Sequence, residues 1–155
     1  MQRALEFEMS VDVLGESSQF CTFYLGDLFL GVSVDGVQEV IRAQEMTPVP
    51  LAPNEVSGLV NLRGQIVTAL DMRKRFAIKG DFPKPPMNIV ISKEDGAVSL
   101  LVDSIGDVVT VDPSQFEEPP ETLVGPCREL ITGVFKLEKA LLLVLDLEAA
   151  SSVGG

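Results

Sequence analysis

Ionisable side chains are the residues most able to perform catalysis, and this chain has many acids but no histidine. The full sequence contains 23 Asp and Glu, 12 Lys and Arg, and no His. A His-dependent triad is therefore unavailable, and no G-x-x-x-x-G-K-[ST] loop is present for phosphate chemistry. Carboxylate pairs such as Asp35 with Asp103 remain, but aspartate at such positions is typical of loops and turns. The composition predicts a protein that is not an enzyme, with a small carboxylate-dependent enzyme as the alternative.

The two cysteines predict neither a metal site nor a cofactor. Cys21 lies in a strand-like run and Cys127 in a proline-flanked loop, without C-x-x-C spacing or a histidine to complete a zinc site. Two reduced thiols are the expected state, and a disulfide is the alternative that remains open.

Charge and hydropathy argue against two further classes of function. The net charge of −11 repels a phosphate backbone, and one Tyr with no Trp offers little base stacking, so nucleic-acid binding is not expected. The longest apolar run, Ala140 to Leu145, is far below the roughly 20 residues of a membrane helix, which predicts no direct membrane insertion. Glu6 and Glu8 interrupt the apolar N-terminus, so no secretory signal and a cytoplasmic location are expected.

Short strands must position any binding residues. Segments of four to eight residues are rich in Val, Ile, Leu and Phe with a period of two, which is the pattern of half-buried strands. The predicted strands are 20–25, 28–34, 65–70, 88–91, 97–102, 107–111, 130–137 and 140–145. Gly26-Asp27 and Glu94-Asp95-Gly96 predict hairpin turns, and single helical turns are expected at 54–57, 71–76 and 146–150. This pattern predicts an all-β barrel or sandwich.

Two matches within the chain indicate an internal duplication. The segment from Val34 to Val40 aligns with Val102 to Val108, 68 positions later. Gly58 to Met72 aligns with Gly133 to Leu147, 75 positions later. Because both matches occur in the same order, we expect two similar barrels of roughly 60 to 70 residues each.

The proline-rich segment 80–86 is the predicted divide between the halves, since its prolines cannot donate to a sheet ladder. The expected organisation is an N-terminal extension (1–18), a single folded unit (19–150) and a tail (151–155). Its halves, approximately 19–82 and 87–150, can exchange strands between the barrels. We expect the halves to share an apolar interface, or seam, because each half is too small to bury enough apolar surface to be stable alone.

The segment 56–73 contains Asn61-Leu62-Arg63-Gly64, an apolar strand and Asp71-Met72-Arg73, and it resembles the central signature of the CheW family. Supporting resemblances lie at 30–32, 37–42, 102–108 and 130–133, so the likeness covers about residues 19–150 in the family's order. It implies a CheW-like domain made of two intertwined five-stranded SH3-like β-barrels with short helices.

Members of this family couple transmembrane chemoreceptors to a CheA-type histidine kinase by binding both. The resemblance therefore implies a non-catalytic adaptor, recruited to receptor arrays at the inner face of the membrane. Its expected partners are the regulatory domain of the kinase and the cytoplasmic tip of methyl-accepting chemoreceptors. A scaffold of a non-motility chemosensory pathway is the alternative.

Seven residues match positions that the family uses for protein contacts. They are Val37, Glu39, Val40, Gly58, Arg63, Ile105 and Val108. On a regular strand Val37 and Glu39 share one face and Val40 takes the other, so only part of the set can face outward together. The alternative is that the apolar members are core residues.

Arg63 has a planar fork of donors that suits a carboxylate of a partner, and the alternative is an ion pair within the chain. The second repeat has Glu138-Lys139 where the first has Arg63-Gly64, which implies that the barrel itself does not require the arginine. Gly64 is expected to serve the backbone of a turn.

Overall fold

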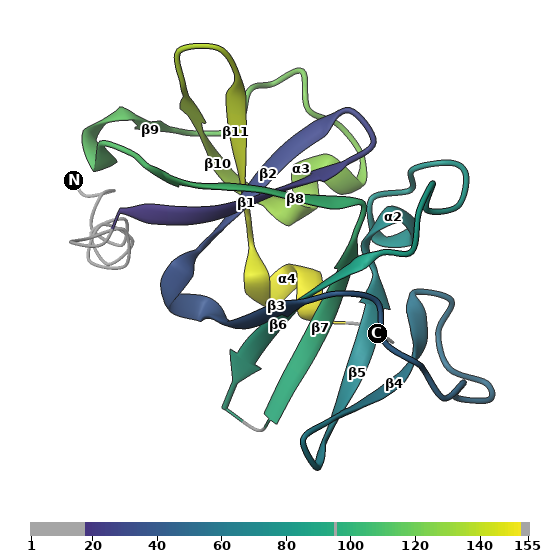
Figure 1. Cartoon of the computed structure of the whole chain (residues 1–155). Coiled ribbons are helices and arrows are strands. Elements are labelled where there is room, and N and C mark those ends of the chain that lie inside the picture. The colour runs from purple at the N-terminus through teal and green to yellow at the C-terminus, as the bar shows by residue number, and fades with distance from the viewer. Residues whose placement is uncertain (1–17, 95, 153–155) are drawn as a thin grey trace.

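The computed structural model describes residues 18–94 and 96–152 and contains two β-sheets with short helices (Figure 1). The six-stranded sheet contains, in spatial order, β8 (Ser104–Thr110), β1 (Gln19–Leu25), β2 (Leu28–Ser33), β11 (Leu141–Leu145), β10 (Ile131–Lys136) and β9 (Phe116–Glu117). The five-stranded sheet contains, in spatial order, β3 (Val37–Ile41), β6 (Met87–Lys93), β7 (Gly96–Val102), β5 (Gln65–Asp71) and β4 (Val56–Leu62). The predicted all-β class is confirmed.

Helical segments are short. They are α2 (Met72–Arg75), α3 (Pro126–Leu130) and α4 (Leu147–Ser151), with 3-10 turns η1 (Val34–Gly36) and η2 (Pro113–Gln115). α2 and α3 lie between strands, and α4 follows β11. The helices predicted after Asp71 and Asp146 are present, and each carboxylate accepts a capping bond from the backbone N–H three residues later. Residues 1–17 lie outside the described part, so the predicted N-terminal extension is not described beyond Ser18.

Two local predictions are wrong. Residues 54–57 do not form a helix, because the backbone N–H of Val56 donates to the carbonyl of Pro53 in a turn and Val56 then begins β4. Cys127 is not in a loop but in α3, which starts at Pro126, since proline is favoured at the first position of a helix. The turn predicted at 94–96 includes Asp95, which is outside the described residues.

The two sheets interleave the halves of the sequence. β6 and β7 from the second half lie in the five-stranded sheet, while β1 and β2 from the first half lie in the six-stranded sheet. Each sheet contains two antiparallel hairpins that are joined by one parallel pair of strands. This pair is β5 with β7 in the five-stranded sheet and β2 with β11 in the six-stranded sheet. The proline-rich segment 80–86 leads from α2 to β6 within one sheet, and the chain crosses between the sheets at η1 and near Asp103 instead.

The predicted duplication is visible in the hydrogen bonds. The backbone N–H of Asp71 donates to the carbonyl of Glu55 at 2.7 Å, and the N–H of Asp146 donates to the carbonyl of Leu130 at 2.8 Å. The edge strands β3 and β8 both contain a bulge in their matched segments. Equivalent residues therefore occupy equivalent places in the two sheets.

Three apolar clusters stabilise this arrangement. One lies within the five-stranded sheet, around Val67 and Val90, and a second lies within the six-stranded sheet, around Phe20 and Leu142. The third joins the two sheets, and we call it the seam cluster. Its fully buried members include Phe23, Leu25, Leu30, Leu70, Met72, Ile89 and Leu100. Since each such side chain contributes about 1.5–3 kcal/mol when buried, the seam ties the two sheets into one folded unit.

Candidate protein-binding site

The turn between β4 and β5 positions Arg63. Arg63 and Gly64 have φ of 52° and 87°, so both central residues of this two-residue hairpin are left-handed, as a type I′ turn requires. The side chain of Asn61 supports the turn by accepting a hydrogen bond from the backbone N–H of Gly64 at 2.9 Å. Gly64 therefore serves the turn, as predicted, and the turn holds Arg63 at one end of the five-stranded sheet.

Arg63 forms a bidentate ion pair with Glu39. Nη1 and Nη2 donate to the two carboxylate oxygens at 2.9 and 2.5 Å. Glu39 lies on β3 and Arg63 follows β4, so the pair connects the two edge strands of this sheet. The structure therefore shows an ion pair within the chain, which was the alternative to a carboxylate of a partner. The Arg63 side chain is still 72% exposed, so its remaining donors face solvent.

The predicted alternation along β3 is wrong. The register shifts between Val37 and Glu39, which pair with Ile91 and Val90, two adjacent residues of β6. Val37 and Glu39 therefore lie on opposite faces, because the extra residue of a bulge reverses the alternation. Val40 shares the face of Val37, on the side of the seam cluster.

The second edge strand, β8, repeats this arrangement. Ile105 and Val108 pair with Phe23 and Cys21, so both point to the seam side of the six-stranded sheet. Ile105 packs against the seam cluster, whereas Val108 is 56% exposed. Val40, at the equivalent position of β3, is 37% exposed.

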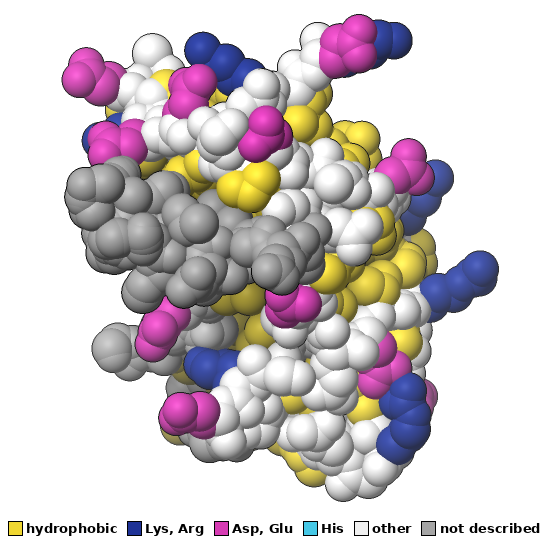
Figure 2. Space-filling model, turned by 90° about the vertical axis from the view of Figure 1, so that its left-hand side faces the viewer, with side chains coloured by type: hydrophobic (Ala, Val, Ile, Leu, Met, Phe, Trp, Pro, Cys, Tyr) yellow, Lys and Arg dark blue, Asp and Glu magenta, His cyan; other side chains and the backbone are white. Residues whose placement is uncertain are grey.

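The four apolar candidates therefore share one environment. All lie on edge strands and face the seam cluster, with Val37 and Ile105 half-buried and Val40 and Val108 exposed. We call Val37, Val40, Ile105 and Val108 the seam surface. Acidic side chains are spread over the molecule rather than gathered in one patch on the face shown in Figure 2.

Gly58 does not belong to this surface, because it is buried. A Cβ on Gly58 would lie 2.8 Å from the carbonyl oxygen of Thr47, which bridges to Leu59 beside it. Its counterpart Gly133 is crossed by Phe116, whose ring would lie 2.2 Å from an added Cβ. Both glycines permit a close approach of a neighbouring segment, which gives Gly58 a packing role in the fold, and its role in protein contacts stays a prediction.

Sequence reasoning missed an ion pair between Arg73 and Asp103. Arg73 donates from Nε and Nη2 to the Asp103 carboxylate at 2.7 and 2.6 Å, and the N–H of Gly26 donates to the same carboxylate. These bonds hold the pKa of Asp103 below its usual range, which is opposite to what a general acid needs. The pair joins α2 to the segment between β7 and β8. The repeat comparison contained a signal for it, because Arg73 matches Glu148 in the second copy and is therefore a difference between the copies.

The remaining candidates for chemistry are isolated. Cys21 and Cys127 are free thiols, and partial burial raises the pKa of both. Within residues 18–94 and 96–152, no group of three or more Cys, Asp or Glu is placed to hold a metal ion. None of the helices in this described part is long and apolar enough to cross a membrane.

Comparisons with known proteins agree with this architecture. The CheW-like domain matches residues 19–153. The chemotaxis protein CheW of Treponema pallidum is 30% identical over 143 residues, which cover 85% of this chain and 81% of that protein. The chemotaxis protein CheW of Klebsiella aerogenes is 30% identical over 131 residues, which cover 84% of this chain and 79% of that protein.

A solved structure shows the same fold. The scaffolding protein TtCheW from Thermoanaerobacter tengcongensis superposes with a TM-score of 0.77 at 25% identity, over 83% of this chain and 88% of that chain. Scaffolding proteins of this family are not catalytic, which confirms on family grounds that the chain is not an enzyme. By its sequence match, its relatives and its interleaved barrels, the chain belongs to the CheW family.

Proposed function

We propose that this chain is a cytoplasmic adaptor that couples transmembrane chemoreceptors to a CheA-type histidine kinase in a bacterial signalling array. Family membership supports the adaptor role, and the names of the relatives, chemotaxis protein and scaffolding protein, support the pathway. The structural observation that supports the proposal is the seam surface, where the matched edge strands of the two sheets each expose a valine, Val40 or Val108, on the seam-cluster side of its own sheet.

The seam surface is suited to an apolar helix or strand of a partner. Val40 and Val108 expose 37% and 56% of their surface beside half-buried apolar neighbours. A partner that covers such area gains about 25 cal/mol per Å² of apolar surface removed from water. The edge strands also leave backbone groups free for strand pairing, so receptor and kinase can each find a contact here.

Arg63 and Glu39 provide a polar neighbour to the seam surface. Glu39 lies between Val37 and Val40 along β3 but points to the opposite face, so the ion pair lies across the edge strand from these apolar residues. The exposed guanidinium can donate hydrogen bonds to a carboxylate of the partner while it remains paired with Glu39. We expect Arg63 to contribute to the choice and orientation of the partner more than to its affinity.

A pull-down of receptor tip, kinase regulatory domain and this chain tests the proposal. We expect Val108→Glu and Val40→Glu to remain folded and to reduce the recovery of the ternary complex strongly, because a carboxylate replaces an apolar contact. Val49→Glu is the matched control, since Val49 is also 37% exposed but lies in the 42–55 loop. Normal complex formation by both folded variants would refute the role of the seam surface.

A further inference from the structure

A cavity of about 570 Å³ lies between the end of β6 and α4, and we call it the α4 cavity. Ile91 and Leu147 provide apolar lining, and Glu94 and Glu148 provide carboxylates at its rim. An apolar concavity with a few polar groups is the usual form of a binding site. None of these residues belongs to the seam surface, so the cavity needs an explanation of its own.

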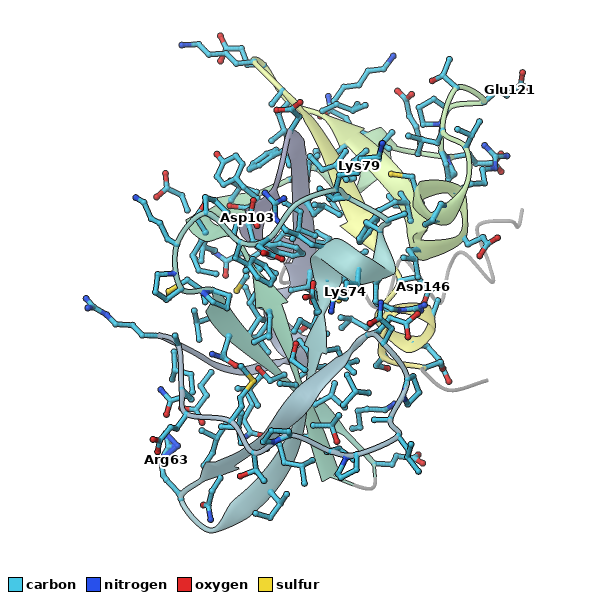
Figure 3. All side chains as sticks on the ribbon, turned by 90° about the vertical axis from the view of Figure 1, so that its right-hand side faces the viewer. Arg63, Lys74, Lys79, Asp103, Glu121 and Asp146 are labelled. Carbon is cyan, nitrogen blue, oxygen red and sulfur yellow. The ribbon has the colours of Figure 1, made fainter. Side chains whose placement is uncertain are left out.

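The duplication shows what occupies the equivalent place in the other half. α4 is the counterpart of α2, because their capping residues Asp146 and Asp71 match at a spacing of 75. The β6–β7 hairpin is the counterpart of the β1–β2 hairpin, at a spacing of 68. The counterpart of the α4 cavity therefore lies between the β1–β2 turn and α2. Figure 3 shows Asp103 and Lys79 near α2, and Asp146 at the start of α4.

In that counterpart, the chain that follows α2 fills the space. Ile78 packs beside Gly26, where an added Cβ would lie 3.6 Å from Ile78 Cγ2. The guanidinium of Arg73 lies 5.9 Å from the centroid of the Phe82 ring and neutralises the carboxylate of Asp103. The filling thus consists of apolar side chains next to a cation.

The α4 cavity has no equivalent of the Arg73–Asp103 ion pair. Glu148 stands where the other copy has Arg73, and Asp35 stands where it has Asp103, so an ion pair is replaced by two carboxylates. Glu94 adds a third carboxylate at the equivalent of Gly26. This difference creates a site that a basic group can neutralise.

Glu94 and Glu148 line the cavity itself, whereas Asp35 is not among the lining residues and lies on the neighbouring turn η1. η1, which contains Asp35, lies beside α4, because a Cβ on Gly36 would lie 3.0 Å from Leu147 Cδ1. Lys93 is the basic residue of the lining, and its Nζ donates to Ser151 Oγ at 3.0 Å. Because this hydroxyl is uncharged, the ammonium of Lys93 offsets one of the two lining carboxylates, Glu94 and Glu148, and one negative charge remains in excess.

We propose that the α4 cavity binds a segment of a partner protein in which an apolar side chain lies next to an arginine or lysine. The segment would occupy the place that Ile78 and Phe82, with the cation of Arg73, occupy in the counterpart. The net charge of −11 favours such a basic partner over an acidic one. This binding does not depend on the seam surface or on the proposed function.

The chain itself supplies a probe for the test. A blocked peptide with the sequence of residues 73–82, which contains Arg73, Ile78 and Phe82, is titrated into the full chain. Binding is followed by fluorescence anisotropy, and methyl NMR locates the site. We expect saturable binding with shifts at the methyl groups of Ile91 and Leu147.

Matched variants separate a built site from charge attraction. Glu148→Lys should weaken peptide binding by about tenfold, because it places a cation where the peptide's cation must lie. Glu138→Lys makes the same change of charge on the exposed β10–β11 turn and should leave the affinity within about twofold. A peptide with serine in place of Ile78 and Phe82 keeps every charge and should bind at least about tenfold more weakly.

Several results would overturn the proposal. Equal loss in Glu148→Lys and Glu138→Lys, or equal binding of the serine peptide, would show charge attraction alone. Shifts at the methyl groups of Leu25 and Met72 instead of Ile91 would show exchange with the chain's own segment in the counterpart. Binding only to a chain shortened to Ser152 would assign the cavity to residues 153–155, and absence of saturable binding would remove the site.

Discussion

The two barrels share one strand order but close their edges with different chemistry. In the five-stranded sheet, the bidentate pair of Arg63 with Glu39 connects the turn after β4 to β3. In the six-stranded sheet the equivalent positions carry Glu138 and Asp107, two acids, and β9 instead pairs with β10. Because the fold tolerates both solutions, the arginine fork is not a requirement of the barrel and is available for recognition.

The same contrast holds beside the two capping helices. Arg73 of α2 and Asp103 form a largely buried ion pair, with both side chains 12% exposed. Glu148 and Asp35 replace them next to α4, where the cavity lies. One copy of the duplicated unit is therefore internally complete, and the other leaves space and negative charge for an external group.

The largest expected effect comes from breaking the complete copy. Arg73→Ala should lower the free energy of unfolding by about 2–3 kcal/mol, because it leaves the carboxylate of Asp103 largely buried without its partner. Glu148→Ala, at the equivalent position, should change it by less than about 0.5 kcal/mol, since that side chain is exposed. Urea unfolding of both variants checks this, and equal losses would contradict the asymmetry of the two copies.

The paired glycines provide a second comparison. Gly133→Ala should cost about 2 kcal/mol, because the new Cβ overlaps the Phe116 ring and approaches the backbone oxygen of Glu117 at 2.7 Å. Gly58→Ala should cost about 1–2 kcal/mol through the carbonyl of Thr47. Thermal unfolding measures both.

The Phe116 ring allows a control for this comparison. Phe116→Ala removes the ring, so combining it with Gly133→Ala should cost less than the sum of the two single changes. Strict additivity would show that the ring is not the source of the strain.

A third prediction concerns pH. The folded protein holds the pKa of Asp103 below its usual range, first through the hydrogen bond from Arg73, so this carboxylate stabilises the fold at pH values above its ordinary pKa. That stabilisation should disappear as the pH falls through the lowered pKa. The unfolding free energy of Asp103→Asn should therefore fall less steeply on acidification than that of the unchanged protein, in urea titrations from pH 6 to about pH 2. Equal slopes would contradict the assignment.

The smallest expected effect lies at the barrel ends. Arg63→Ala should lower the free energy of unfolding by only about 0.5–1 kcal/mol, because the guanidinium is 72% exposed and solvent screens the pair. Lys136→Ala, which breaks the exposed 3.6 Å pair with Glu117, should cost about 0–0.5 kcal/mol. A double-mutant cycle with Glu39→Ala measures the coupling of Arg63, and a coupling above about 2 kcal/mol would make Arg63 a structural residue.

Period-two patterns predicted the strands whose faces are buried in a regular way. The expected strands 65–70 and 97–102 correspond closely to β5 and β7, both within the sheet interior. β3 and β4 were not among the predicted strands, because the bulge at Val37 to Glu39 and the glycine at position 58 interrupt the alternation. A period-two pattern in the sequence predicts a strand only where the backbone is regularly pleated, so strands with a bulge or a glycine are missed.

The candidate site shows the same division. The repeat comparison correctly separated core positions such as Leu62 from Arg63, because residues kept in both copies serve the shared fold. It could not reveal that Arg63 meets Glu39, since the two lie on opposite edges of one sheet and 24 residues apart in the chain. The same comparison predicts core roles for Ile66 and its counterpart Leu141, and this prediction is wrong, because Ile66 is 58% and Leu141 39% exposed. Roles in protein contacts were implied by resemblance alone and remain predictions.

The parallel contacts have a consequence for synthesis. β2 leaves the ribosome early, but its neighbour β11 is the last strand to be made, and β1 must wait for β8. Neither barrel can therefore be completed during translation of the first half, and the early hairpin emerges with one apolar face uncovered. Until β8 and β11 have been made, the edges of this early hairpin lack the strands that cover them in the folded protein.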